Sequence, residues 1–240
     1  MINMIPSIII CSKCGTENSR FNHDCTDCGN ILRDRVANID LWETLSGIID
    51  HPGETFDKII FAENKNFTSF FVVLAVLKYF FLTLLFSFHF YEYQFDKVLM
   101  LYFQFLVLLG VFLLLPFFLI KTGNFRTLNL KWRDLMAGVS YSYAPIAMSA
   151  ALLIFFEFII YGGFLFNNQP SPLDFKQSFG VMFVLLEVIF IIWTLVLNTS
   201  LFHRFGIKRI TALVISLLMM SVYSVICFLT INYLNFNQAG

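Results

Sequence analysis

The sequence predicts an all-α membrane protein in which five transmembrane helices follow a small cytoplasmic zinc ribbon and short amphipathic helices. Apolar residues make up 58% of the 240 residues, and charged residues only 13%. A soluble domain carries about 25% charged residues, so this chain has too few charges to cover a surface that faces water. Five long apolar stretches predict the spans, and a cysteine-rich segment near the start predicts the ribbon.

The zinc ribbon is predicted in residues 1–33, where Cys-x-x-Cys-Gly occurs twice, at Cys11, Cys14, Cys25 and Cys28. A glycine follows each pair, and glycine permits the tight turn that lets two thiolates three residues apart reach one ion. Four thiolates leave no open coordination position, so the pattern predicts one structural zinc ion as the cofactor. The alternatives are an iron centre, a redox pair or a degenerate site that binds no metal, and His23 is a further candidate ligand.

Residues 34–66 predict two short amphipathic helices between the cysteines and the first span. Asp40 and Glu43 stand at the spacing of a capping box, which marks the start of the first helix. Pro52 starts the second helix. Apolar residues recur at helical spacing in both, at Leu41, Trp42, Leu45, Ile48 and Ile49 and then at Phe56, Ile59 and Ile60. The two helices either lie in the cytoplasmic membrane interface or pack against the ends of the spans.

Residues 67–235 form the predicted transmembrane domain. A helix needs about 20 predominantly apolar residues to cross a bilayer. Five stretches reach that length, namely 67–90, 98–120, 135–166, 179–202 and 210–233. The third is too long for one straight crossing, and Gly138, Pro145 and the pair Gly162–Gly163 predict a kinked helix with interfacial ends.

The loops between the spans predict the orientation, because Lys and Arg accumulate on the cytoplasmic side. The loops at 121–134 and 203–209 are basic, whereas the alternate loops hold one basic residue each, Lys97 and Lys176. Five crossings then place the N-terminus in the cytoplasm and the C-terminus outside, and we expect a bacterial cytoplasmic membrane. The cytoplasm keeps thiols reduced, which favours metal over disulfides in the cysteine segment.

Three ionisable residues fall inside the predicted spans: Lys78, Glu157 and Glu187. Each costs at least ~2.5 kcal/mol at the centre of a bilayer, so each should face the bundle interior, a water cavity or a partner. Lys78 lies about 16 Å along its span, beyond the reach of a snorkelling lysine. Its depth matches that of Glu187 better than that of Glu157, so we predict a Lys78–Glu187 pair. The pair either fixes the arrangement of the helices or belongs to an ion or proton path.

Two further residues in the spans have simpler predicted roles: Asn198 as an interhelical hydrogen-bonding group and Cys227 as a small packing residue. The sequence contains no H-E-x-x-H, G-x-S-x-G, P-loop or G-x-G-x-x-G motif, and its four histidines are scattered, so we expect no enzymatic activity. Residues 1–66 are acidic overall, which argues against nucleic-acid binding.

Three segments carry a family resemblance: HPGETFDKII at 51–60, YSYAPIAM at 141–148 and WTLVLNTSLFHRFGIKRITALVIS at 193–216. With the five predicted spans, they resemble the Yip family of five-span membrane proteins, named for interaction with Ypt/Rab GTPases, and more closely its prokaryotic type with an N-terminal zinc ribbon. The resemblance covers about residues 50–235. The eukaryotic relatives imply vesicle transport and a partner-binding cytoplasmic N-terminal region. The chain lacks their acidic Asp-Leu-Tyr-Gly-Pro type segment before the first span, and this departure argues against Rab binding.

We therefore expect a non-enzymatic integral membrane scaffold or adaptor, acting in membrane organisation or trafficking, whose zinc head recruits a cytoplasmic partner. The expected partners are the lipid bilayer and a cytoplasmic protein, without nucleic acid, and a homo-oligomer is compatible with the sequence. The alternative is a small-solute or ion channel or transporter that uses Lys78, Glu157 and Glu187.

Overall fold

The computed structural model of the protein describes residues 8–19, 22–32, 36–86, 95–122, 131–166 and 176–236. Strands β1 (Ile8–Ile10) and β2 (Glu17–Ser19) pair in an antiparallel hairpin, and every other regular element in these segments is a helix. The helices are α1 (Leu41–Asp50), α2 (Pro52–Phe61), α3 (Thr68–Phe86), α4 (Phe95–Thr122), α5 (Trp132–Ser142), α6 (Ala144–Tyr161), the 3-10 helix η1 (Gly162–Phe166), α8 (Gln177–Arg204) and α9 (Arg209–Phe236).

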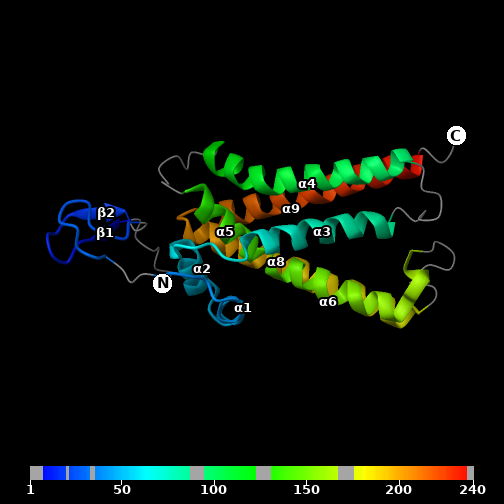
Figure 1. The fold of residues 1–240 in the computed structure, drawn as a ribbon, viewed down its shortest axis with the longest axis horizontal. Helices are drawn as coiled ribbons and strands as arrows, with labels where there is room; N and C mark the ends of the chain where they lie inside the picture. Colours follow the sequence, from blue (N-terminus) through cyan, green and yellow to red (C-terminus); the bar gives the residue numbers. More distant parts are fainter. Residues whose placement is uncertain are drawn as a thin grey trace.

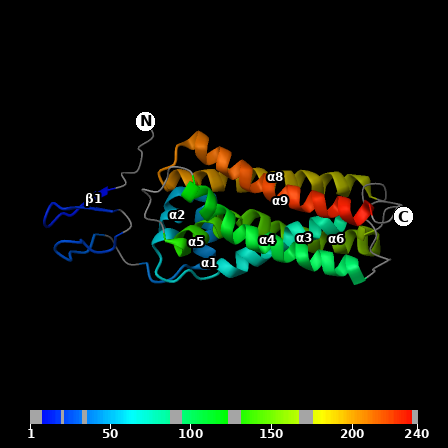
Figure 2. The same cartoon turned by 90° about the horizontal axis from the view of Figure 1, so that it is seen from above.

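Five helices, α3, α4, α6, α8 and α9, run side by side along the long axis of the molecule (Figure 1). The β1–β2 hairpin, α1, α2 and α5 lie at one end of this bundle, and the end of α9 lies at the other (Figure 2). The cysteine-rich head and the last helical turn are therefore separated by the full length of the bundle.

Four helical stretches are long and apolar enough to cross a membrane: Leu99–Lys121, Ala144–Leu165, Gln177–Arg204 and Arg209–Asn232. This agrees with an integral membrane protein. Helix α3 occupies the place of the first predicted span, but its apolar stretch Thr68–Thr83 is shorter than the about 20 residues that a crossing needs. Residues 87–90 of that predicted span lie outside the described residues.

The third predicted span, 135–166, is not one kinked helix but two helices joined at Tyr143. Pro145 lacks a backbone N–H and restricts the residue before it, so it favours the first turn of a helix over the interior of one, and α6 begins here. Helix α5 is buried along Leu135–Ser142 at the head end of the bundle, and only α6 continues along the long axis. Gly162, with φ of 53°, ends α6.

The linker contains the two predicted helices, and their starts are as predicted. The carboxylate of Asp40 accepts a hydrogen bond from the backbone N–H of Glu43 at 2.8 Å, and Pro52 stands at the start of α2. The apolar side of α2, with Phe56, Ile59 and Ile60, is buried, and α2 contacts α5 and α8. Helix α2 was expected either to lie in the membrane interface or to pack against the ends of the spans, and in the structure it packs against the end of the bundle.

Helix α1 differs from α2 because only part of its apolar side is covered. Ile48 is buried, whereas the side chains of Trp42 and Ile49 are 77% and 60% exposed. Residues seven apart in a helix lie on the same side, so these two side chains form one exposed apolar strip.

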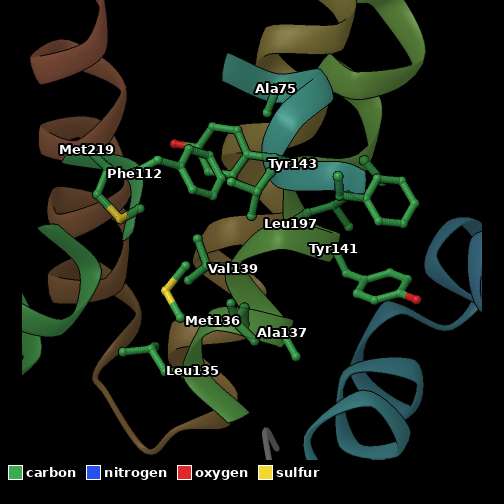
Figure 3. Close-up of a cluster of buried hydrophobic side chains, with 14 of the residues drawn as sticks. Ala75, Phe112, Leu135, Met136, Ala137, Val139, Tyr141, Tyr143, Leu197 and Met219 are labelled. Atoms are coloured by element: carbon green, nitrogen blue, oxygen red, sulfur yellow. The ribbon is translucent and has the colours of Figure 1, made fainter. Parts of the chain in front are cut away.

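The core of the bundle is built around the junction of α5 and α6. Figure 3 shows Tyr143 directed towards Phe112 of α4 and Met219 of α9, while Tyr141 is directed away from them. The rings of Tyr143 and Phe112 are 5.0 Å apart at their centroids. The hydroxyl of Tyr141 donates a hydrogen bond at 3.0 Å to the carbonyl of Asn66, just before α3. The break between the two helices therefore places one tyrosine in the core and uses the other to fix the start of α3.

Candidate metal centre and buried charge cluster

The four cysteines of the head come from two similar turns. In the first, the N–H of Gly15 donates to the carbonyl of Cys11 at 2.9 Å, and in the second that of Gly29 donates to the carbonyl of Cys25 at 3.0 Å. The two glycines have φ of 75° and 66°, a left-handed conformation that a side chain disfavours. Glycine at these positions lets each turn close, so that both cysteines of a pair face the same point.

The four sulfur atoms converge and lie within 4.8 Å of one another. The Sγ atoms of Cys11 and Cys28 are 3.6 Å apart, and those of Cys14 and Cys25 are 3.5 Å apart. A tetrahedral site with Zn–S bonds of about 2.3 Å has sulfur atoms about 3.8 Å apart. The four residues therefore fit one tetrahedral metal ion, as the spacing predicts, with a cysteine at every position.

Backbone N–H groups prepare two of the thiols for a metal. Those of Cys28 and Asp27 lower the pKa of the Cys25 thiol to about 6, and those of Cys14 and Lys13 lower the pKa of the Cys11 thiol. For Cys28 the backbone N–H of Asn30 acts in the same direction, but the Cys14 thiol and burial outweigh it and raise the pKa to about 12. Cys11 and Cys25 therefore lose their protons more readily than an ordinary thiol, which favours binding of a metal cation.

Two asparagines support the cysteines, and the sequence analysis did not identify them. The Asn18 side-chain amide is buried, donates to Cys25 Sγ at 3.3 Å and accepts from the N–H of Thr26 at 2.8 Å. The Asn30 amide donates to Cys11 Sγ at 4.0 Å. Such contacts orient metal ligands, but no spacing rule in the sequence points to them. His23 lies outside the cluster, and its Nδ1 contacts the carboxylate of Asp24 at 2.6 Å.

The buried charges gather at a second place, inside the bundle. The structure brings Lys78 of α3 and Glu187 of α8 together, with the ammonium donating to Oε1 of the carboxylate. The side chain of Lys78 is 3% exposed and that of Glu187 is 19% exposed. Lys78 thus has the partner that its predicted depth in the membrane favours.

Glu157 of α6 is a third ionisable residue buried in the bundle, close enough to Lys78 and Glu187 to interact with both through its charge. It is 8% exposed, and its Oε2 atom is buried without a hydrogen-bond partner among the described residues. The cluster thus contains one cation and two carboxyl groups, and one carboxyl oxygen is unsatisfied.

Uncharged polar side chains join the helices elsewhere in the bundle. Asn198 of α8 accepts a hydrogen bond from the hydroxyl of Ser142 of α5 at 2.8 Å, which is the interhelical bond that the sequence predicts. Cys227 of α9 is more than a packing residue, since its thiol donates to the carbonyl of Tyr79 at 3.5 Å. Gln104 of α4 donates to the hydroxyl of Thr83 at 2.6 Å and was missed, although an amide in an apolar stretch is a usable signal.

Comparison of the chain with protein-family models, curated proteins and solved structures finds no match.

Proposed function

We propose that the protein is an integral membrane adaptor whose zinc-binding head recruits a cytoplasmic protein. The observation that supports this most strongly is the closed set of four converging cysteine thiols at one end of the bundle. The buried Lys78 is already paired with Glu187, so its charge is matched within the protein. A four-thiolate site has no open position for a substrate, so its role is structural. Zinc fits such a site best, because it is bound tetrahedrally by thiolates and needs no redox chemistry.

We further propose five crossings, with α3 as the first and the head in the cytoplasm. Helix α3 contacts α4, α6 and α9 and lies parallel to them, as a membrane-spanning member of the bundle should (Figure 1). The basic residues Lys121, Arg133, Arg204 and Arg209 lie at helix ends that share the head's side of the bundle. This distribution supports a cytoplasmic head, since Lys and Arg favour that side. The Yip-like segments favour the same topology.

The surface of the head indicates what kind of partner it would bind. Ile8 and Ile10 of β1 and Ile31 are 45%, 66% and 65% exposed. These exposed apolar side chains are available to an apolar surface of a partner. The hairpin has only two strands, so one edge of β1 is open to a partner strand within the described residues.

Separately from the head, a cavity of about 430 Å³ lies between α1 and α2. Its lining includes Asp40, Glu43, Asp50 and Glu54. Electrostatic complementarity then favours a partner whose surface is basic as well as apolar.

Site-specific photocrosslinking in native membranes tests recruitment with the full chain. A photoreactive residue at Ile10 should capture one defined cytoplasmic protein, and the same residue at Ile192, on the exposed side of α8, should capture none. The variant Ile10→Asp should keep its metal and its expression level but lose the partner. Recruitment is contradicted if the adducts from positions 10 and 192 are the same.

A transport function is the second candidate, favoured by the unsatisfied Oε2 of Glu157 beside the Lys78–Glu187 pair. A buried carboxyl oxygen without a partner is a place where a proton or a small cation would bind. Protein reconstituted into liposomes should then carry a cation or proton flux that Glu157→Gln abolishes. Absence of flux in the wild type would leave the adaptor function as the sole candidate.

A further inference from the structure

A crevice of about 410 Å³ lies between α3, α4 and α5, at the end of the bundle that carries the head. Much of its wall is apolar and comes from Val73 of α3, Leu109 and Leu113 of α4 and Met136 of α5. Val73 is 47% exposed and the two leucines are only partly buried, so this wall opens to the outside of the bundle. In a membrane, the crevice would therefore face lipid.

The polar part of the crevice is formed by Lys65, Ser69 and Arg133. The ammonium of Lys65 is held by Asp134 at 3.0 Å and by the carbonyls of Ile59 and Ile60, so its charge is already matched. Arg133 is exposed, and no ion pair or hydrogen bond of its side chain is found among the described residues. The crevice thus combines an apolar wall with a guanidinium group that is available to an anion.

Two aromatic contacts connect Trp132 of the crevice to a second cation, Lys121. Trp132 lines the crevice, and its ring packs edge-on against Phe117 with centroids 5.2 Å apart. The ammonium of Lys121 lies 4.7 Å from the centroid of the Phe117 ring. A tryptophan flanked by Lys and Arg is typical of the level at which lipid headgroups lie.

We infer that this crevice binds an anionic phospholipid, with the phosphate at the Arg133 end and one acyl chain along Val73, Leu109 and Leu113. Basic pockets between membrane helices on the cytoplasmic side bind anionic headgroups, and both halves of the site match that chemistry. A zwitterionic lipid carries its own ammonium group, which Arg133 and Lys121 would repel. This site is separate from the head, so lipid binding is independent of partner recruitment.

Native mass spectrometry of the full chain, released from nanodiscs, tests the inference. Nanodiscs with equal amounts of phosphatidylglycerol and phosphatidylcholine should yield protein that retains phosphatidylglycerol preferentially. Arg133→Gln should weaken this retention about fivefold, which is the effect of one basic side chain at an anionic membrane surface. Arg209→Gln is the matched control, because Arg209 is also exposed at the head end but does not line the crevice, and this variant should retain the lipid.

A second variant tests the apolar wall. Val73→Trp should fill the crevice and abolish retention, whereas Val188→Trp, at a comparably exposed valine of α8, should leave it unchanged. Equal retention of both lipids by the wild type, or full retention in Arg133→Gln, would overturn the inference. Displacement of the lipid by millimolar glycerol phosphate would overturn it too, since the site would then recognise a free phosphate. If Val73→Trp fails to fold, the comparison of Arg133→Gln with Arg209→Gln decides alone.

Discussion

The ammonium of Lys78 in α3 contacts the carboxylate of Glu187 in α8, 109 positions further along the chain. This contact links α3 to the long helix α8 in the interior of the bundle. A buried charge costs several kcal/mol unless it is paired, so each residue stabilises the bundle chiefly by compensating the charge of the other.

We predict that replacing either residue of this pair alone destabilises the protein, because it leaves the other charge buried without a partner. Lys78→Met should lower stability by about 3 kcal/mol, since it leaves Glu187 unpaired beside Glu157, and Glu187→Gln should also be destabilising. The double variant should recover most of the loss in thermal unfolding of purified protein. The exposed pair Lys58–Glu43 is the control, because loss of a solvated ion pair should have no measurable effect. Additive losses in the double variant would show that the pair is not coupled.

The cysteine cluster predicts one zinc ion per chain and separate roles for the head and the bundle. Cys25→Ser should lose the metal and expose the head to proteolysis, because a segment of this size needs the ion to fold. The melting temperature of the bundle should not change. Cys227→Ser should retain the ion, since Cys227 is in α9 and outside the cluster. Elemental analysis of the two variants measures this, and equal metal content would refute the assignment.

The contact between α5 and α8 predicts opposite results for two glycines. A Cβ atom on Gly138 would lie 2.7 Å from Cδ1 of Leu201, a fully buried side chain, whereas one on Gly110 would meet nothing within 4 Å. Gly138→Ala should therefore destabilise by about 1–3 kcal/mol through overpacking. Gly110→Ala should be neutral or stabilise by up to about 1 kcal/mol, because alanine is the better helix former. Similar melting temperatures for both variants would mean that α5 does not pack this closely.

We predict that α2 unfolds together with the bundle. Substitutions on the exposed side of α1 should then affect stability much less than those on the buried side of α2. Ile59→Ala removes a side chain that is fully buried and should cost about 2–5 kcal/mol. Ile49→Ala removes an isoleucine that is 60% exposed and should change stability by less than about 0.5 kcal/mol in detergent. Equal effects of the two substitutions on unfolding would show that α2 is a loosely attached linker.

The sequence predicts the local features of this protein well, because each has a short-range cause. The cysteine spacing fixes which thiols converge, Asp40 starts α1 through a bond to a residue three positions on, and Pro52 starts α2. The depth of Lys78 also suffices to select Glu187, since helices that cross a membrane side by side align residues of equal depth.

Features that depend on packing are harder to predict. The split of the third predicted span is an exception, because α5 is much less apolar than α6 and Pro145 marks the boundary between them. The apolar side of α2 looks the same whether it faces lipid or the bundle, and only the contacts with α5 and α8 distinguish the two. The amides of Asn18 and Asn30 reach the thiols through the turns of the head, which no sequence period encodes.

The adaptor account depends most on the head and the end of α9 lying on opposite sides of one membrane. Reporter fusions to the two ends of the full chain measure this directly. A reporter active only in the cytoplasm should be active at the N-terminus, and one active only outside should be active after Gly240. Cytoplasmic activity at both ends would mean that the chain crosses the membrane four times and that α3 does not cross it. This result would contradict the account.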